Sequence, residues 1–409
     1  MSSILLVLPV PYRHINGALH IESQAANGLD RWADNFDRVV AACPVIPEAE
    51  ADKRSSWKWV HERSLAQKDR IRLVGLPWAR TPGSFLANCG KVRRSLLHKL
   101  ISECNYLQFA IGGLIGDWPS VAALEARRMN RAYSVWTDRV ESEVVRITAA
   151  QHSMGKRQLS FANAWLMKRY EHHIIRNAQL GLFHGAETFH AYSGLPRHAF
   201  LTHDVHTKKR DLISPGEVAN KVASASDVER PLRIGYAGRA SAMKAPLDWL
   251  NVLVQLRAMG VAYEATWLGD GEMLPDMHAF VTSHSLGGHV AMPGFVSDRD
   301  RLLSFLRSCD VLLFTHITPE SPRIILESLV SGTPVVGYAN GYVADVVAVE
   351  DRRLLAPLGD TAQIAEIIAG LARNRKVLAE AIRSAARTGE QFNDVAVFRH
   401  RSELIKQYL

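Results

Sequence analysis

The sequence lacks any long hydrophobic run. No segment approaches 18 uninterrupted apolar residues, so we expect no membrane-spanning helix. Residues 4–8 are apolar, but the run is short and no basic segment precedes it, which favours a buried first strand over a signal peptide. The four cysteines have neither metal-site nor redox spacing, so we expect reduced thiols in a cytoplasmic protein.

The sequence also has no internal repeat, low-complexity tract or recognised nucleic-acid motif. Its basic residues are not interleaved with an aromatic platform, so a nucleic-acid partner is not indicated. The hydrophobic fraction of 47% and the charged fraction of 22% are typical of a globular protein. A chain of 409 residues is longer than one domain usually is, and we expect two domains.

Short apolar segments alternate with amphipathic helical segments along almost the whole chain. The strand candidates of the first half are 4–8, 39–42, 71–74, 106–110, 133–136, 180–183 and 199–202. Those of the second half are 232–236, 262–268, 290–292, 311–314 and 334–336. Strands separated by helices indicate βαβ units, and two such arrays in series predict two α/β domains with parallel sheets. Ligands of such sheets bind at the carboxyl ends of the strands, so we expect the site in a cleft between the domains.

The predicted boundaries follow changes in composition. Residues 1–213 form the first predicted domain, and residues 214–230 form a linker because they contain Pro215-Gly216 and are rich in Ala, Ser and Asp. Residues 231–391 form the second domain. A final helical segment, 392–409, completes the chain.

The most informative segment is 319–336, which predicts a loop, a helix and a short buried strand. Glu320 and Pro322 fit the start of the helix, and Gly332 fits its end. Glu320 and Glu327 are seven residues apart, about two turns, and lie on roughly the same face. A helix N-terminus can hold an anion such as a diphosphate, and a carboxylate can accept hydrogen bonds from ribose hydroxyls. The combination suits a nucleotide-sugar.

This segment resembles the acidic motif of the family 4 retaining glycosyltransferases (glycosyl transferases group 1), which have the GT-B fold of two facing Rossmann-like domains. Upstream, a strand ends in Gly238-Arg239, and Lys244 follows the arginine at the family's spacing of five residues. Residues 267–271 and 293–296 resemble the family's next two strand-to-turn segments. The resemblance covers residues 236–336, and the first half matches only in outline.

The resemblance implies a donor site in the second domain, with no cofactor beyond the donor substrate, a nucleoside diphosphate sugar. The residues implied to bind this donor are Gly17, Gly238, Arg239, Lys244, Gly269, Phe295, Glu320, Ser321, Pro322, Arg323, Ile324 and Glu327. We expect Arg239, Lys244 and Glu320 to act in catalysis, since two fixed cations stabilise the charge that develops on the diphosphate. No Asp-x-Asp motif lies at a matching strand end, so the reaction does not require a metal ion. The resemblance also implies that the last helix crosses back to the first domain.

The first domain offers weaker candidates. Asp138 and Glu141 follow a predicted strand. In one interpretation they contact the acceptor or act as a base. In the other they form an ordinary ion pair with Arg139. Gly17 lies in a loop that the resemblance places near the donor diphosphate, with a plain strand-to-helix turn as the alternative. No histidine follows Gly112-Gly113, where the family often has one that contacts the donor sugar.

Net charge is +8, and the excess lies in the first half. The basic clusters are 91–99, 127–131, 168–176 and 208–210. Basic helices with apolar faces suit an anionic membrane surface or an acceptor that carries a diphosphate, and solvated helix faces are the alternative.

The sequence therefore predicts a retaining, metal-independent glycosyltransferase of the hexosyl type. It would transfer sugar to a glycan, glycolipid or lipid-linked acceptor in bacterial polysaccharide assembly, in the cytoplasm or at the inner face of the cell membrane. Two alternatives stay open. Six residues separate Glu320 and Glu327 where the family has seven, which leaves room for a weakly active or inactive GT-B protein that binds a nucleotide or a partner. A GT-B sugar epimerase is the other, but Arg239 and Lys244 do not favour it.

Overall fold

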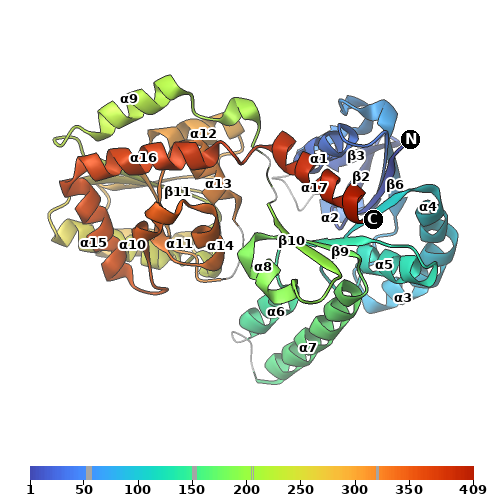
Figure 1. The fold of residues 1–409 in the computed structure, drawn as a ribbon. Coiled ribbons are helices and arrows are strands. Elements are labelled where there is room, and N and C mark those ends of the chain that lie inside the picture. Colours follow the sequence, from blue (N-terminus) through green and yellow to red (C-terminus); the bar gives the residue numbers. More distant parts are fainter. Residues whose placement is uncertain (52–57, 150–153, 204, 206, 319–321) are drawn as a thin grey trace. The chain divides into compact units, whose positions relative to one another are not determined.

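The computed structural model describes residues 1–51, 58–149, 154–203, 205, 207–318 and 322–409. The chain forms two compact units (Figure 1). Unit 1 comprises Met1–His206 and Asp394–Leu409, and unit 2 comprises Thr207–Asn393.

Unit 1 is built around a parallel sheet. Among the described residues, seven strands pair in the order β10-β9-β8-β7-β1-β4-β6, and every neighbouring pair is parallel. Their bounds are β1 Ser3–Val7, β4 Arg38–Pro44, β6 Ile71–Leu76, β7 Tyr106–Ala110, β8 Ser134–Thr137, β9 Leu180–His184 and β10 His198–Thr202. Strands β1 and β9 are buried along their whole length, as expected where helices cover both faces of a sheet.

Helices pack on both faces of this sheet. The helices of unit 1 are α1 Ser23–Ala33, α2 Glu48–Ala51, α3 Pro82–Lys91, α4 His98–Glu103, α5 Trp118–Arg128, α6 Glu141–Ala149, α7 Met154–Arg176, α8 Gly185–Tyr192 and α17 Asp394–Tyr408. The chain's last helix, α17, buries Phe398 and Ile405 in the same core as Trp32 of α1. The guanidinium of Arg401 lies 5.1 Å from the ring centre of Trp32 and 5.2 Å from that of Trp136. These apolar and cation–π contacts hold residues 394–409 in unit 1.

Unit 2 has a second parallel sheet, with the order β13-β12-β11-β14-β15-β16 in the described part of the chain. Its strands are β11 Leu232–Ala237, β12 Tyr263–Leu268, β13 Val290–Gly294, β14 Val311–Phe314, β15 Val335–Tyr338 and β16 Leu355–Ala356. Its helices are α9 Pro215–Ala225, α10 Pro246–Ala258, α11 Leu274–Ser283, α12 Arg299–Ser308, α13 Arg323–Val330, α14 Gly341–Val346, α15 Thr361–Arg373 and α16 Arg375–Gly389. Strands β12 and β13 follow on one side of β11, and β14, β15 and β16 follow on its other side.

The predicted α/β class with two parallel sheets is confirmed, and all twelve predicted strands occur within a few residues of their expected positions. The sequence did not reveal the antiparallel sheet of β2 Tyr12–Ile15, β3 Ala18–Glu22 and β5 Trp59–His61, nor the short strand β16. In the described part of the chain, no helix combines the length and apolarity needed to cross a membrane.

Residues 214–230 differ from the predicted linker, because most of them form helix α9. Ser214 and Glu217 make a capping box, in which Glu217 Oε2 accepts from Ser214 N at 2.8 Å and Ser214 Oγ accepts from Glu217 N at 3.3 Å. Lys221 Nζ donates to the carbonyl oxygens of Leu306 and Ser331. Burial lowers the pKa of Lys221 to about 7. The small residues that predicted a linker therefore belong to a capped and packed helix of unit 2.

Candidate active site

The candidate site of unit 2 lies where the strand order of its sheet reverses. Strands β11 and β14 are neighbours, and the crossovers that follow them run in opposite directions. In open α/β sheets, ligands bind outside the carboxyl ends of the strands at such a reversal. The loop after β11 carries Gly238, Arg239 and Lys244, and the loop after β14 leads to α13. The sequence motifs therefore come together on both sides of the reversal.

Two glycines shape the first of these loops. Gly238 N donates to Leu268 O at 2.8 Å, and Gly269 N donates to Gly294 O at 2.9 Å. A Cβ atom on Gly269, whose φ is +146°, would lie 2.0 Å from Gly238 O. Only glycine allows this approach of backbone to backbone, so Gly269 acts by shaping the edge of the sheet.

Arg239 and Lys244 are placed differently. Arg239 is exposed and forms no hydrogen bond or ion pair with any residue that the structure describes. Lys244 is half-buried, and Thr315 Oγ1 donates to its carbonyl oxygen at 3.0 Å. Ile317 N donates to Met243 O at 3.0 Å. The loop after β14 thus holds the backbone that carries Lys244.

Helix α13 starts and ends close to the predicted positions. Pro322 is its N-cap residue rather than a member of its first turn, and Arg323 is its first residue. Gly332 has a φ of +62° and its N–H donates to Leu329 O at 2.9 Å, as predicted for the residue that ends the helix. Arg323 is exposed and the side chain of Ile324 is buried. Glu320 and Ser321 lie outside the described residues.

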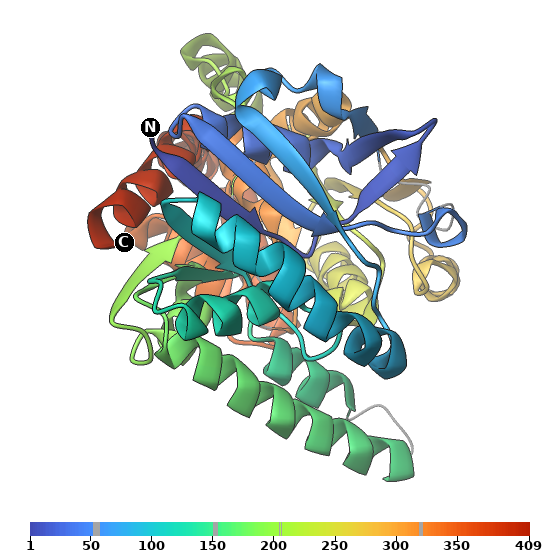
Figure 2. The ribbon, with the colours of Figure 1, turned by 90° about the vertical axis from the view of Figure 1, so that its right-hand side faces the viewer.

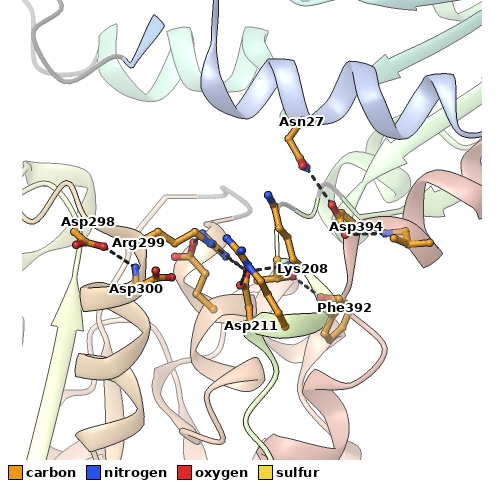
Figure 3. Close-up of polar contacts among 12 residues, drawn as sticks. Asn27, Lys208, Asp211, Asp298, Arg299, Asp300, Phe392 and Asp394 are labelled. Atoms are coloured by element: carbon orange, nitrogen blue, oxygen red, sulfur yellow. Dashed lines mark hydrogen bonds and ion pairs between the residues drawn. The ribbon is translucent and has the colours of Figure 1, made fainter. Parts of the chain in front are cut away.

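Glu327 forms an ion-pair network that the sequence did not reveal. Figure 3 labels two other members of this network, Arg299 and Asp211. Arg299 Nη1 donates to Glu327 Oε1 at 2.8 Å, and Arg299 Nη2 donates to Asp211 Oδ2 at 3.1 Å. Lys208 N also donates to Asp211 Oδ2, at 2.8 Å. Burial lowers the pKa of Arg299, but Glu327 and Asp211 outweigh burial and raise this pKa overall. The side chain of Glu327 is 14% exposed, so the network holds a partly accessible carboxylate in a fixed place.

Arg299 lies between two aspartates that have Asp-x-Asp spacing (Figure 3). Asp298 is the N-cap of α12, and its Oδ1 accepts from the N–H groups of Asp300 at 2.9 Å and Arg301 at 3.3 Å. Helix capping therefore accounts for Asp298. Phe295, just beyond β13, is 56% exposed and leaves an aromatic face open at the carboxyl edge of the sheet.

The unit 1 candidates do not form one cluster around Asp138. Gly17 and Asn16 both have positive φ and make the turn between β2 and β3. This is a β-hairpin, which neither interpretation of the sequence anticipated. Asp138 is exposed, and Arg139 Nε donates to Glu141 Oε1 at 2.7 Å. The ion pair with Arg139 thus involves Glu141.

Three carboxylates near the ends of β7 and β8 are better buried than Asp138. Burial raises the pKa of Asp117 to about 7 and that of Glu171 to about 7, and it also raises the pKa of Glu141. Ser120 Oγ donates to Asp117 Oδ2, and Tyr192 Oη donates to Glu171 Oε2 at 3.0 Å. A Cβ on Gly112 would lie 3.6 Å from Glu141 Oε1. The Gly112-Gly113 loop noted in the sequence therefore lies beside carboxylates.

Residues 220–388 match the model of the family described as glycosyl transferases group 1. The chain is 30% identical over 159 residues to a 2-deoxystreptamine N-acetyl-D-glucosaminyltransferase of Streptomyces fradiae, a match that covers 37% of each chain. It is 21% identical over 280 residues to the amylovoran biosynthesis glycosyltransferase AmsK of Erwinia amylovora, covering 60% of this chain and 68% of AmsK. The crystal structure of Anabaena Alr3699/HepE in complex with UDP is similar over 100% of both chains, with a TM-score of 0.65 and 16% identity.

Proposed function

We propose that this chain, which has the GT-B fold and carries a glycosyl transferases group 1 domain at residues 220–388, transfers a sugar from a nucleoside diphosphate sugar to an acceptor. The fold and the domain agree with the resemblance recognised in the sequence. One observation carries the proposal. An exposed arginine without a partner among the described residues and a half-buried lysine share one loop at the strand-order reversal of unit 2.

Arg239 and Lys244 would bind the donor diphosphate. Breaking the bond between sugar and phosphate leaves extra negative charge on the diphosphate, and preorganised cations stabilise that charge as it forms. Arg239 has a planar guanidinium that suits two phosphate oxygens, and Lys244 adds a compact charge. That HepE, which has a similar fold, was crystallised in complex with UDP supports a nucleoside diphosphate as the kind of ligand.

Glu327 would accept hydrogen bonds from the ribose hydroxyls of the donor. Arg299 would act as a positioning residue, because it binds one carboxylate oxygen of Glu327 and is itself bound by buried Asp211. Phe295 would stack on the base of the nucleotide. Gly238, Pro322, Arg323 and Ile324 would shape the site and the start of α13, where anions are favoured.

The transfer would retain the configuration of the sugar and need no metal ion. The leaving phosphate would take the proton of the acceptor hydroxyl on the same face on which the new bond forms. Glu320 would contact the donor sugar, and Gly17 would lie near the diphosphate. Asp138 in unit 1 would contact the acceptor.

The acceptor would be a glycan, a glycolipid or a lipid-linked sugar in bacterial polysaccharide assembly, at an anionic membrane surface. The similarity to AmsK, an amylovoran biosynthesis glycosyltransferase, supports this class. The similarity to a transferase that acts on 2-deoxystreptamine supports testing small amine-bearing acceptors as well.

The decisive experiment is a sugar-release assay with a panel of nucleoside diphosphate sugars, after a thermal-shift screen of the free diphosphates. Binding of the correct nucleotide to the folded chain raises the unfolding temperature of the chain by mass action. Release of sugar from one donor, faster with an acceptor extract than without it, supports the proposal. Binding without release supports a nucleotide-binding module, and a changed sugar that stays attached to the nucleotide supports an epimerase.

A further inference from the structure

Helix α7 has an outer face that is both basic and apolar. No other described element of unit 1 runs over the outer side of this helix (Figure 2). Its inner side is buried and includes Ala164, Met167, Glu171, Ile174 and Ile175. On its outer side, Trp165 is 58% exposed and Leu166 is 53% exposed. Large apolar side chains that adjoin one another on an exposed surface are typical of interaction sites.

The same face gathers positive charge. Trp165, Arg169 and Arg176 are four and seven residues apart, so they share one side of the helix. A groove of about 540 Å³ is lined by Trp165, Lys168, Arg169, His172, His173 and Arg176. Arg127 of α5 reaches the rim, where its Nη1 lies 2.9 Å from His173 Nε2. Lys168, Arg169 and Arg176 form no ion pair with the acidic residues that the structure describes.

Aromatic residues and arginines alternate along α7 as they do in helices that lie on lipid. The guanidinium of Arg169 is 5.0 Å from the ring centre of Trp165, and that of Arg157 is 5.5 Å from that of Phe161. Leu159, in the same half of the helix, is also exposed. Such pairs place an amphipathic ring at the level of the headgroups and a cation beside the phosphates.

The other basic helices of unit 1 are less available. Arg93 Nε lies 3.3 Å from Glu125 Oε2, and Lys99 Nζ lies 3.9 Å from Glu103 Oε1. Arg94 Nε donates to Gly90 O at 3.3 Å. These side chains already have hydrogen-bond or ion-pair partners within their own unit, whereas Lys168, Arg169 and Arg176 form no ion pair with the acidic residues that the structure describes.

We propose that the outer face of α7 is a docking surface for an anionic lipid bilayer, with the guanidinium and ammonium groups on lipid phosphates and with Trp165 and Leu166 at the headgroup boundary. The positive charge of this face favours an anionic bilayer over a second copy of the chain. A second copy of the chain would bring several unpaired cations against the same cations, since a twofold interface pairs each patch with itself. The inference depends on the proposed function only in taking the membrane as the place where the acceptor lies.

The test is co-sedimentation of the full chain with phosphatidylglycerol–phosphatidylcholine vesicles and with phosphatidylcholine vesicles, at low and high salt. We expect salt-sensitive binding to the anionic vesicles alone. The triple variant Lys168→Glu, Arg169→Glu, Arg176→Glu should lower the binding constant at least about a hundredfold, since each basic residue near an anionic leaflet accounts for about a fivefold change. Salt weakens the interaction because the Debye length falls.

A matched control is available on α16 of unit 2. Lys376→Glu, Arg383→Glu, Arg387→Glu changes the same residue types and the same net charge at exposed positions of a single helix. We expect this control to keep nearly all of the binding. An equal loss in both triple variants would overturn the proposal, because binding would then follow net charge rather than α7.

A second variant separates lipid from free phosphate. Trp165→Ser with Leu166→Ser keeps the cations and should weaken vesicle binding about tenfold at both salt concentrations, since it removes apolar burial. Unchanged vesicle binding in this variant would contradict a bilayer surface and point to a simple anion groove. A dimer in sedimentation velocity without vesicles, dissociated by the same two changes, would instead assign the face to a second copy.

These outcomes are independent of catalysis. Vesicle binding is measured without donor, and titration with a nucleoside diphosphate reports the unit 2 site separately. Vesicle binding without sugar transfer would leave this inference standing and overturn the proposed function. Sugar transfer without vesicle binding would support the proposed function and overturn this inference.

Discussion

The loop after β11 in unit 2 and the segments after β7 and β8 in unit 1 differ in the charged residues that they bring to the sheet edge. In unit 2, the loop after β11 carries Arg239 and Lys244, and the arginine is exposed. In unit 1, the segments near the ends of β7 and β8 include Asp117 and Glu141, joined by Glu171 of α7. Both edges come from the same kind of sheet, so the fold alone does not decide what either edge binds.

The difference suits two halves of one transfer reaction. Exposed cations bind a diphosphate and stabilise the charge on it. Carboxylates with a pKa near neutrality can exchange protons and accept hydrogen bonds from hydroxyl or amine groups. If unit 2 handles the leaving anion and unit 1 the incoming nucleophile, each edge should respond to substitution in its own measurement.

The largest effect is expected at the cations. Arg239→Ala and Lys244→Ala should each lower turnover about a hundredfold or more, because each removes a group that stabilises the charge of the transition state. Initial rates of sugar release from the best donor measure this change.

Arg233→Ala is the matched control, since Arg233 is an exposed residue of β11 at the opposite end of the strand. The control should keep its turnover. Full activity in both the Arg239 and the Lys244 variants, with unchanged unfolding temperatures, would remove these residues from the site.

The next effect concerns Glu327 and the arginine that holds it. Glu327→Ala should weaken binding of the free nucleoside diphosphate by roughly 1.5–3 kcal/mol, because ribose hydroxyls lose a charged acceptor. Arg299→Lys should weaken binding less, since lysine keeps the charge but cannot bind Glu327 and Asp211 together. Titration calorimetry measures both affinities.

Arg301→Lys provides a control two residues further along α12, where the side chain is exposed. It should leave the affinity unchanged. Equal affinity of wild type and Glu327→Ala would show that the ribose contacts another group. Glu320→Ala should spare diphosphate binding and reduce transfer.

The sequence predicted residues whose function depends on spacing along the chain. Gly238, Arg239 and Lys244 lie within one loop, and Gly332 lies two residues beyond the last residue of its helix, so local patterns were enough. The partners of Arg299 are 88 and 28 residues away, at Asp211 and Glu327, and no local pattern could link them. Only the folded sheet brings these three together.

Burial was the second thing that the sequence could not supply. Glu171 occurs in a basic run of α7 that looks like a solvated face, yet it is only 4% exposed. The Ser214-to-Glu217 capping box was present in the sequence, but the surrounding small residues favoured a linker. Both errors arose because composition does not say which side of a helix packs.

The carboxylates of unit 1 predict a pH effect on stability. Burial raises the pKa of Glu171 from 4.5 to about 7 and that of Asp117 from 3.8 to about 7. Between these values the folded state binds more protons than the unfolded state, so stability falls as pH rises from about 4 to about 7. Glu171→Gln should remove part of this loss and gain on the order of 1 kcal/mol at pH 8.

Thermal unfolding of wild type and Glu171→Gln at pH 5 and pH 8 provides the measurement. The variant should gain more at pH 8, while Glu143→Gln, a change at a half-buried position of α6 that pairs with Arg146, should shift neither value by a comparable amount. A difference that does not depend on pH would mean that Glu171 keeps an ordinary pKa.

The smallest effect is expected at Asp138. Asp138→Asn keeps the size of the side chain and removes its charge, so the contact with an acceptor hydroxyl should weaken by about 0.5–1.5 kcal/mol, roughly a threefold to tenfold rise in KM for the acceptor. Donor release in the absence of acceptor should not change, because the cations of unit 2 are untouched. Glu141→Gln is the informative comparison, since Glu141 pairs with Arg139 and its change should alter stability rather than acceptor affinity. An acceptor KM that rises in Glu141→Gln but stays the same in Asp138→Asn would move the acceptor contact from the exposed carboxylate to the half-buried one.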